Sequence, residues 1–306
     1  MIRLGLCCAF IKEDIKFRSA TARYVLSLPV PERWTYVDLI ARDNTAALLQ
    51  ALKWCAANGV GAFRINSQFF PLYTHPQAGY ALDDLPSGAE ITTGLKRCGQ
   101  FARSAGIRLS FHPDQFVVPG SPSESAARMS LLELEYQARI ARLLHAEQLT
   151  LHGGGAYGDK TSALKRTAEA FAALPRATRE LIALENDDRV FTVKDLAPLC
   201  AAQGMKFIYD VHHHRCLPDG LSETEALKLC VESWRGAEPW LHLSSPLGGW
   251  SAKDPRAHAD YINPRDVPAE WLEMDVTVDI EAKAKELAVL KLKRWLKSRV
   301  PAKSGG

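Results

Sequence analysis

The residues best suited to chemistry lie in one stretch, 207–216, where an apolar run ends in Asp210 and the histidines His212, His213 and His214 follow. A short apolar run of this kind is typical of a buried strand. Carboxylate oxygen and neutral imidazole nitrogen together suit Zn²⁺, Mn²⁺ or Fe²⁺. A solvated polar loop with a chance run of histidines is the alternative interpretation, and residues elsewhere in the chain distinguish the two.

Similar side chains follow other apolar runs. Metal-capable side chains end six successive predicted strands, the third to the eighth: His112, His152, Glu185, Asp210, His242 and Glu281. In a barrel of parallel strands the carboxyl ends meet at one mouth, so we expect these side chains to be neighbours. Unpaired polar groups clustered at the edge of a core are costly, which favours a metal site over six separate structural roles.

This set of carboxylates and imidazoles exceeds what one tetrahedral ion needs. Glu185 is central in the strand order, so we expect it to bridge two ions in a multinuclear centre. Such centres suit in-line displacement at phosphorus. Within the histidine run, only residues that point the same way can share an ion, and we favour Asp210 with His213, leaving His212 and His214 in supporting roles.

Three further histidines are less clearly placed. His258 lies in the long loop after the seventh predicted strand and could reach the mouth. The spacing of His75 alone favours a surface position. His145 lies near a predicted helix end, where an interaction with the helix dipole is sufficient to explain it.

The elements that must position these residues alternate regularly. The predicted strands are 3–10, 62–65, 107–111, 148–151, 181–184, 206–209, 240–241 and 276–280. Helical periodicity falls between them, for example from Asp43 to Cys55 and over 193–203. Eight such units without a linker predict a single (β/α)₈ TIM barrel over residues 1–300, with a disordered tail at 301–306. A doubly wound sheet is the alternative.

The composition limits the class of protein. The chain has 306 residues, 47% of them hydrophobic and 24% charged, as expected for a globular domain. A net charge of +3 permits a polyanionic partner without demonstrating one. Seven cysteines without CxxC spacing predict reduced thiols. With neither a signal peptide nor a membrane-spanning run in the sequence, we expect a cytoplasmic protein without membrane association.

Four motifs carry a family resemblance: HPDQF (112–116), HGGGAYGDK (152–160), LENDD (184–188) and DVHHHR (210–215). Further matching segments extend from RLGLCC (3–8) to DIEAKAKE (279–286) and occur in the same order. With this highly specific combination, the chain resembles the UV-damage endonuclease family of the UvsE/UVDE type.

The resemblance implies a TIM barrel related to the endonuclease IV type of abasic-site endonuclease. It implies a centre of two or three divalent ions, typically Mn²⁺, with Zn²⁺ or Co²⁺ as alternatives. The implied partner is damaged double-stranded DNA, which a monomer would incise 5′ to a UV photoproduct, an abasic site or a similar distortion. Catalysis would depend on Glu185, Glu281 and His242, with the two glutamates holding the ions that activate water.

The resemblance also assigns residues. The implied metal ligands are His75, His112, His152, Glu185, Asp210, His213, His242, His258 and Glu281. Gln115 and Phe116 match a polar–aromatic pair that probes the lesion, and an inserted aromatic ring is a physically sensible sensor of weakened base stacking. Ordinary packing of Phe116 is the alternative. The cationic residues beside the motifs, candidates for phosphate contacts, are Arg64, Lys160, Arg215 and Lys283.

One departure from the family concerns the seventh strand. Many members carry a lysine two residues before the strand-seven histidine, and this chain has Trp240 there. The change leaves the implied ligand set intact. Two other classes remain open on the residues alone: a metal-dependent sugar isomerase or epimerase barrel, and a barrel that binds without catalysis.

Overall fold

Eight short, mostly buried strands form the centre of the molecule, and the computed structural model describes residues 1–299. The strands are β1 (Ile2–Cys7), β2 (Ala62–Ile65), β3 (Arg108–Phe111), β4 (Gln148–His152), β5 (Ile182–Glu185), β6 (Lys206–Asp210), β7 (Trp240–Leu243) and β8 (Val276–Ile280). They pair in parallel in sequence order, and β8 pairs with β1, so the sheet closes into a barrel. The predicted TIM barrel is confirmed, and closure excludes the doubly wound alternative.

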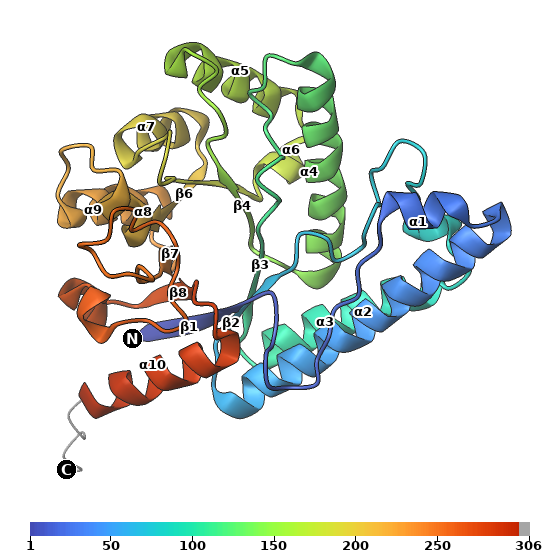
Figure 1. Cartoon of the computed structure of the whole chain (residues 1–306), viewed down its shortest axis with the longest axis horizontal. Coiled ribbons are helices and arrows are strands. Elements are labelled where there is room, and N and C mark those ends of the chain that lie inside the picture. The colour runs from blue at the N-terminus through green and yellow to red at the C-terminus, as the bar shows by residue number, and fades with distance from the viewer. Residues whose placement is uncertain (300–306) are drawn as a thin grey trace.

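Helices cover the outside of this barrel (Figure 1). The α-helices are α1 (Ala22–Ser27), α2 (Val30–Asn58), α3 (Gly88–Ser104), α4 (Glu124–Leu144), α5 (Lys160–Ala173), α6 (Arg176–Arg179), α7 (Val193–Gln203), α8 (Val211–Cys216), α9 (Glu223–Ser233) and α10 (Lys285–Arg299). Short 3₁₀ helices are η1 (Leu82–Asp84), η2 (Pro264–Asp266) and η3 (Ala269–Glu273).

Local sequence signals explain several of the helix ends. Thr192 and Asp195 form a capping box at the start of α7, and the Asp159 side chain accepts hydrogen bonds from the first backbone N–H groups of α5. Gly59 and Gly204 follow α2 and α7 in the left-handed conformation, which glycine adopts without steric cost. These caps set the point at which each strand–helix unit turns.

Two of the predicted boundaries were clearly wrong, and others, such as the end of β7 at Leu243 in place of 241, differ by a residue or two. The first strand ends at Cys7, not at Phe10, because Cys8 has a positive φ of 65° that interrupts the extended chain. Helix α2 begins at Val30, well before Asp43, with Pro31 in its first turn. Proline is tolerated there because the first N–H groups of a helix have no intrahelical partner.

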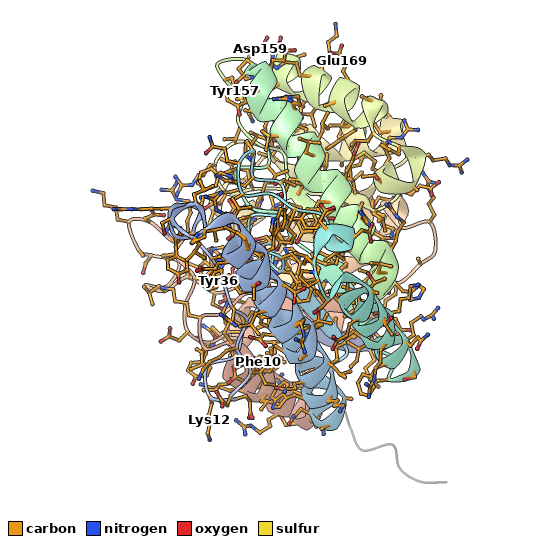
Figure 2. All side chains as sticks on the ribbon, turned by 90° about the vertical axis from the view of Figure 1, so that its right-hand side faces the viewer. Phe10, Lys12, Tyr36, Tyr157, Asp159 and Glu169 are labelled. Atoms are coloured by element: carbon orange, nitrogen blue, oxygen red, sulfur yellow. The ribbon has the colours of Figure 1, made fainter. Side chains whose placement is uncertain are left out.

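The loop after β1 lies against the longest helix. Figure 2 shows α2 crossing the face toward the viewer past Tyr36, with Phe10 and Lys12 in the loop beside it. The ring of Phe10 packs edge-on against Trp54 of α2, with centroids 5.2 Å apart. This packing holds the loop against the C-terminal part of α2.

The predicted domain boundary at residue 300 stays a prediction, and the tail at 301–306 lies outside the described residues. Within residues 1–299, no helix combines the length and the apolar character that crossing a bilayer requires.

Candidate metal centre

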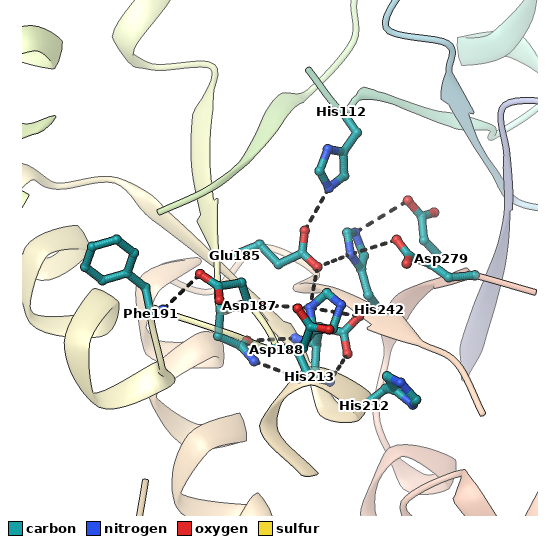
Figure 3. A network of polar contacts seen from close by, with 12 residues as sticks. His112, Glu185, Asp187, Asp188, Phe191, His212, His213, His242 and Asp279 are labelled. Carbon is teal, nitrogen blue, oxygen red and sulfur yellow. Dashed lines mark hydrogen bonds and ion pairs between the residues drawn. The ribbon is translucent and has the colours of Figure 1, made fainter. Parts of the chain in front are cut away.

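The carboxyl ends of six strands bring their polar side chains to one mouth of the barrel. His152, Glu185 and Asp210 are the last residues of β4, β5 and β6, and His242 lies within β7. His112 and Glu281 directly follow β3 and β8. Figure 3 shows Glu185 between His112, His242 and His213.

One group of possible ligands consists of His112, Glu185, His242 and Glu281, with ligand atoms all within 4.8 Å of one another. Glu185 Oε2 lies 2.9 Å from Nε2 of His112, and Glu185 Oε1 lies 2.9 Å from Nδ1 of His242. The same His242 nitrogen is 3.3 Å from Glu281 Oε1. Two imidazoles and two carboxylates therefore converge on one small volume.

The second group contains His152, Glu185 and His213. Nδ1 of His213 lies 3.3 Å from Glu185 Oε1 and 2.9 Å from the carbonyl oxygen of Asn186. Asp210 Oδ2 lies 3.7 Å from the same nitrogen, at the edge of this group. Glu185 belongs to both groups, which is the arrangement expected of a bridging carboxylate.

Attraction between the carboxylates and the imidazoles outweighs the effect of burial on the pKa values of both. Burial alone would raise the pKa of Glu185, but the imidazoles of His242 and His152 and the neighbouring hydrogen bonds hold it well below its ordinary value. Burial likewise opposes protonation of His242 and His213. Glu185 nevertheless raises the pKa of His242 to about 9, and Asp210 with Glu185 raises that of His213 well above its ordinary value. Glu185 is therefore ionised, and it strongly favours positive charge next to it.

Glu281, the fourth member of the first group, pairs with the guanidinium of Arg64. Burial would raise the pKa of Glu281, yet Arg64 and then His242 hold it well below the ordinary value. Nη1 of Arg64 lies 2.5 Å from Glu281 Oε1. The charge of Arg64 therefore offsets that of Glu281. Arg64 is 9% exposed, so it is poorly placed to reach along a DNA backbone.

Several buried polar atoms of the centre have no hydrogen-bond partner among residues 1–299: His152 Nδ1, Glu185 Oε1, Asp210 Oδ2, His242 Nδ1 and His242 Nε2. Buried atoms of this kind are costly to leave unpaired. Glu185 Oε1 and His242 Nδ1 lie 2.9 Å apart without hydrogen-bond orientation, and two ligands of one ion are typically about 3 Å apart. The imidazole and carboxylate donors fit divalent Mn²⁺, Zn²⁺ or Co²⁺.

The remaining predicted ligands lie outside these two groups. Nδ1 of His258 is 3.7 Å from Glu281 Oε2, and its ring centroid is 6.3 Å from that of His213, so it borders the centre. Nδ1 of His75 instead accepts hydrogen bonds from the backbone of Gln77 and Ala78, each at 3.2 Å. The structure does not place His75 in either group of ligands, so its ligand role stays a prediction.

The other two histidines of the run point elsewhere. The ring of His214 contacts the hydroxyl of Tyr209 at 2.8 Å and lies 3.3 Å from Asp219. His212 is fully buried with its ring beside Trp250, at 5.2 Å between centroids. Of the three, His213 faces Glu185.

Above the centre is an open hollow of about 410 Å³. Its lining residues include Cys8, Arg64, Asn66, His112, Gln115, His152, His213, His258 and Glu281. Phe116 follows Gln115 and is 78% exposed, so core packing does not account for this aromatic ring.

Besides Arg64, two more of the predicted phosphate-binding cations are engaged within the protein. Lys160 Nζ lies 2.7 Å from Asp195 Oδ2, and Arg215 pairs with Glu223 at 2.7 Å. Lys283 is exposed, and among residues 1–299 it forms no ion pair. Of the predicted phosphate contacts, Lys283 is therefore the one whose charge is most available.

Two residues that the sequence did not single out support the centre. The side chain of Asn186 bonds the backbone of Asp210 through both of its polar atoms, at 2.9 and 3.0 Å. Asp279 is fully buried on β8, two residues before Glu281. A charged residue inside the otherwise apolar strand 276–280 was the available signal for Asp279.

Trp240, which stands where many family members carry a lysine, is also fully buried. Its ring lies under the guanidinium of Arg108.

Comparisons with known proteins identify the family of the chain. The model of the family described as UV-endonuclease UvdE matches residues 2–303. A UV DNA damage endonuclease of Bacillus pumilus (strain SAFR-032) is 31% identical over 266 residues, covering 82% of this chain and 79% of that protein. A UV-damage endonuclease of Neurospora crassa is 30% identical over 86% of this chain, but the chain spans only 42% of that relative's length.

Among solved structures, SacUVDE superposes with a TM-score of 0.86 at 29% identity, covering 97% of this chain and 99% of that one. Endonuclease IV from Thermus thermophilus has a TM-score of 0.64 at 17% identity, over 97% of this chain and all of the other. A 3-keto-D-glucoside 4-epimerase from E. coli has a TM-score of 0.56 at 11% identity, over 97% of this chain and all of that one, so these two share the fold alone. The family match over nearly the whole chain is decisive, and the chain belongs to the UV-endonuclease UvdE family.

Proposed function

We propose that this protein is a DNA repair endonuclease that incises duplex DNA 5′ to UV photoproducts, and at abasic or similarly distorted sites, by metal-assisted hydrolysis of a phosphodiester bond. The observation that carries the proposal is Glu185, a buried carboxylate shared by two groups of imidazoles below an open hollow. Membership of the UvdE family gives the substrate class.

The proposed centre holds two or three divalent ions, with Mn²⁺ as the leading candidate. One group of ligands is His112, Glu185, His242 and Glu281, and the other is His152, Glu185 and His213, with Asp210 and His258 at the edges. Divalent ions bound there supply an activated water and neutralise charge on the phosphate oxygens.

The residues of the chain have separate roles in this proposal. Glu185 and Glu281 hold negative charge at the floor of the hollow, which selects cations and orients the imidazoles. Arg64 offsets part of the charge of Glu281 and fixes its carboxylate. Gln115 and Phe116 enter the duplex at the rim, where an exposed ring can occupy the space of a poorly stacked base. Lys283 contacts the DNA backbone.

The sugar epimerase alternative is not favoured, because the epimerase structures share only the fold. The two classes differ in their response to salt. Binding of duplex DNA falls steeply as salt rises, because phosphate contacts release counterions, whereas binding of a neutral sugar does not. The proposal includes a reducing compartment, which the seven free cysteines support. It also includes a monomer, which size-exclusion chromatography tests.

The decisive experiment is a nicking assay with purified full-length protein. With Mn²⁺, we expect incision of UV-irradiated plasmid and not of untreated plasmid. Synthetic duplexes carrying one photoproduct or one abasic site then give the position of the cut. No incision with Mn²⁺, Zn²⁺ or Co²⁺ would refute the proposal, and so would a Glu185→Ala variant that incises as well as the wild type.

A further inference from the structure

Asp279 is a buried carboxylate of the barrel interior that has no place in either group of ligands. It lies within β8 with no exposed surface, and among residues 1–299 neither of its oxygens accepts a well-formed hydrogen bond. Burial raises the pKa of Asp279, and the charges of Arg64 and His242 and the indole N–H of Trp240 oppose that rise. Side chains two residues apart on a strand share a face, so Thr277, Asp279 and Glu281 point the same way. Thr277 bonds Glu238 and Arg108, Glu281 reaches the mouth, and Asp279 lies between them.

The space for this carboxylate is made by a glycine on the next strand. Gly5 of β1 is in register with Asp279, and a Cβ at Gly5 would lie only 2.1 Å from Asp279 Oδ1. Any side chain at position 5 would displace the carboxylate, so the absence of one lets Asp279 lie across β1 inside the barrel.

On the other side of β8, Asp279 is in register with His242 of β7. Nε2 of His242 lies 3.7 Å from Asp279 Oδ2 and has no hydrogen-bond partner in the described chain. Nδ1 of the same ring lies on the opposite side, 2.9 Å from Glu185 Oε1 (Figure 3). The ring therefore stands between the metal-site carboxylates and Asp279.

A histidine that offers Nδ1 to a metal carries its proton on Nε2, and that buried N–H requires an acceptor. Asp279 Oδ2 is the facing carboxylate oxygen. The present separation is longer than a hydrogen bond, and a shift of roughly 1 Å closes it.

We propose that Asp279 is a positioning residue that accepts the Nε2–H of His242, so that Nδ1 of this ring faces the metal centre. The role differs from that of Glu185 or Glu281, because Asp279 acts through His242 and does not itself bind an ion. Acceptors of this kind fix both the tautomer and the orientation of a ligating histidine, and their removal typically weakens metal binding about 10–100-fold.

This inference rests on the metal centre of the proposed function, so the test measures Zn²⁺ binding directly. Full-length wild type and Asp279→Asn are titrated with Zn²⁺ against a chromophoric chelator, and both are labelled with ¹⁵N in the histidine rings. We expect Asp279→Asn to bind the same number of ions, with an affinity about 10–100-fold weaker. In Zn²⁺-loaded wild type, His242, assigned by its absence from His242→Asn, should carry its proton on Nε2 and bind Zn²⁺ through Nδ1.

Asp38→Asn is the matched control. Asp38 is also a buried aspartate, but it lies on α2 and accepts hydrogen bonds from Ser87. Its Zn²⁺ affinity should equal that of the wild type. Wild-type affinity in Asp279→Asn, loss of one bound ion, or Zn²⁺ on Nε2 of His242 would each overturn the inference. The wild-type spectrum decides the question even if Asp279→Asn does not fold. A wild type that binds no Zn²⁺ would overturn the metal centre as well, whereas the other outcomes concern Asp279 alone.

Discussion

Replacing Glu185 by glutamine keeps the shape of the side chain and removes the negative charge that both ligand groups share. In the metal-free protein, burial lowers the pKa of His242, and Glu185 overcomes this to raise it to about 9. The difference from the ordinary value of about 6.5 corresponds to roughly 3 kcal/mol. Most of this coupling should disappear in Glu185→Gln.

The sign of the effect follows from the raised pKa of His242. Protonation of this ring stabilises the folded state fully below pH 6.5, and the contribution is lost as the pH rises through about 9. Metal-free wild type should therefore lose about 3 kcal/mol of unfolding free energy over this interval through His242. Glu185→Gln should lose far less, as measured by urea denaturation in the presence of a chelator at several pH values.

The same substitution removes a ligand from both groups. We expect incision of irradiated plasmid with Mn²⁺ to fall about 1,000-fold, which corresponds to roughly 4 kcal/mol of transition-state stabilisation. Glu286→Gln is a matched control, because Glu286 is 1% exposed but accepts hydrogen bonds from the backbone of Ile11 and Lys12, outside the two ligand groups. It should keep the activity and the pH dependence of the wild type. An unchanged pH dependence in Glu185→Gln would refute the electrostatic account of the centre.

Three further substitutions test the surroundings of the centre. Phe116→Ala should leave the unfolding free energy within about 0.5 kcal/mol and weaken binding of photoproduct duplex by about 1–3 kcal/mol in fluorescence anisotropy; an equal loss on undamaged duplex would contradict lesion probing. Lys283→Ala should reduce the slope of log Kobs against log salt concentration by about 1. Lys160→Ala should not change that slope, and the reverse result would reassign the phosphate contact. Gly5→Ala should cost about 1–3 kcal/mol in denaturant unfolding and weaken Zn²⁺ binding by displacing Asp279, so wild-type values for both would contradict the packing argument.

The barrel could be predicted because each strand–helix unit carries its own local signals. Strand β8 and helix α7 have the bounds that alternation and capping residues indicate. Once the strands are known to be parallel, their carboxyl ends must meet, and this rule alone brings His112 next to Glu185 without any contact information. The errors lie where a local signal was ambiguous, as with Pro31 in the first turn of α2.

Asp279 and Asn186 could not be predicted in the same way, because their roles depend on contacts between strands. The neighbour of Asp279 on β7 is set by the pairing register, and the space beside it is set by closure of β8 against β1. A local pattern shows that an acid interrupts an apolar strand, but it cannot show that His242 stands opposite. Asn186 is similar, since its hydrogen bonds to the backbone of Asp210 exist only when β5 and β6 are neighbours.

The histidine run shows why the number of histidines is a weaker guide than the ends of strands. Helix α8 begins directly after Asp210, and successive residues of a helix differ by about 100° in direction. His212 therefore turns toward Trp250 and His214 toward Tyr209, while His213 faces Glu185. Asp210 also accepts a hydrogen bond from the backbone N–H of His213, at 2.8 Å. The residue that ends β6 thus caps the helix that carries His213, and replacing Asp210 would disturb the position of His213 in addition to removing a carboxylate from the edge of the centre.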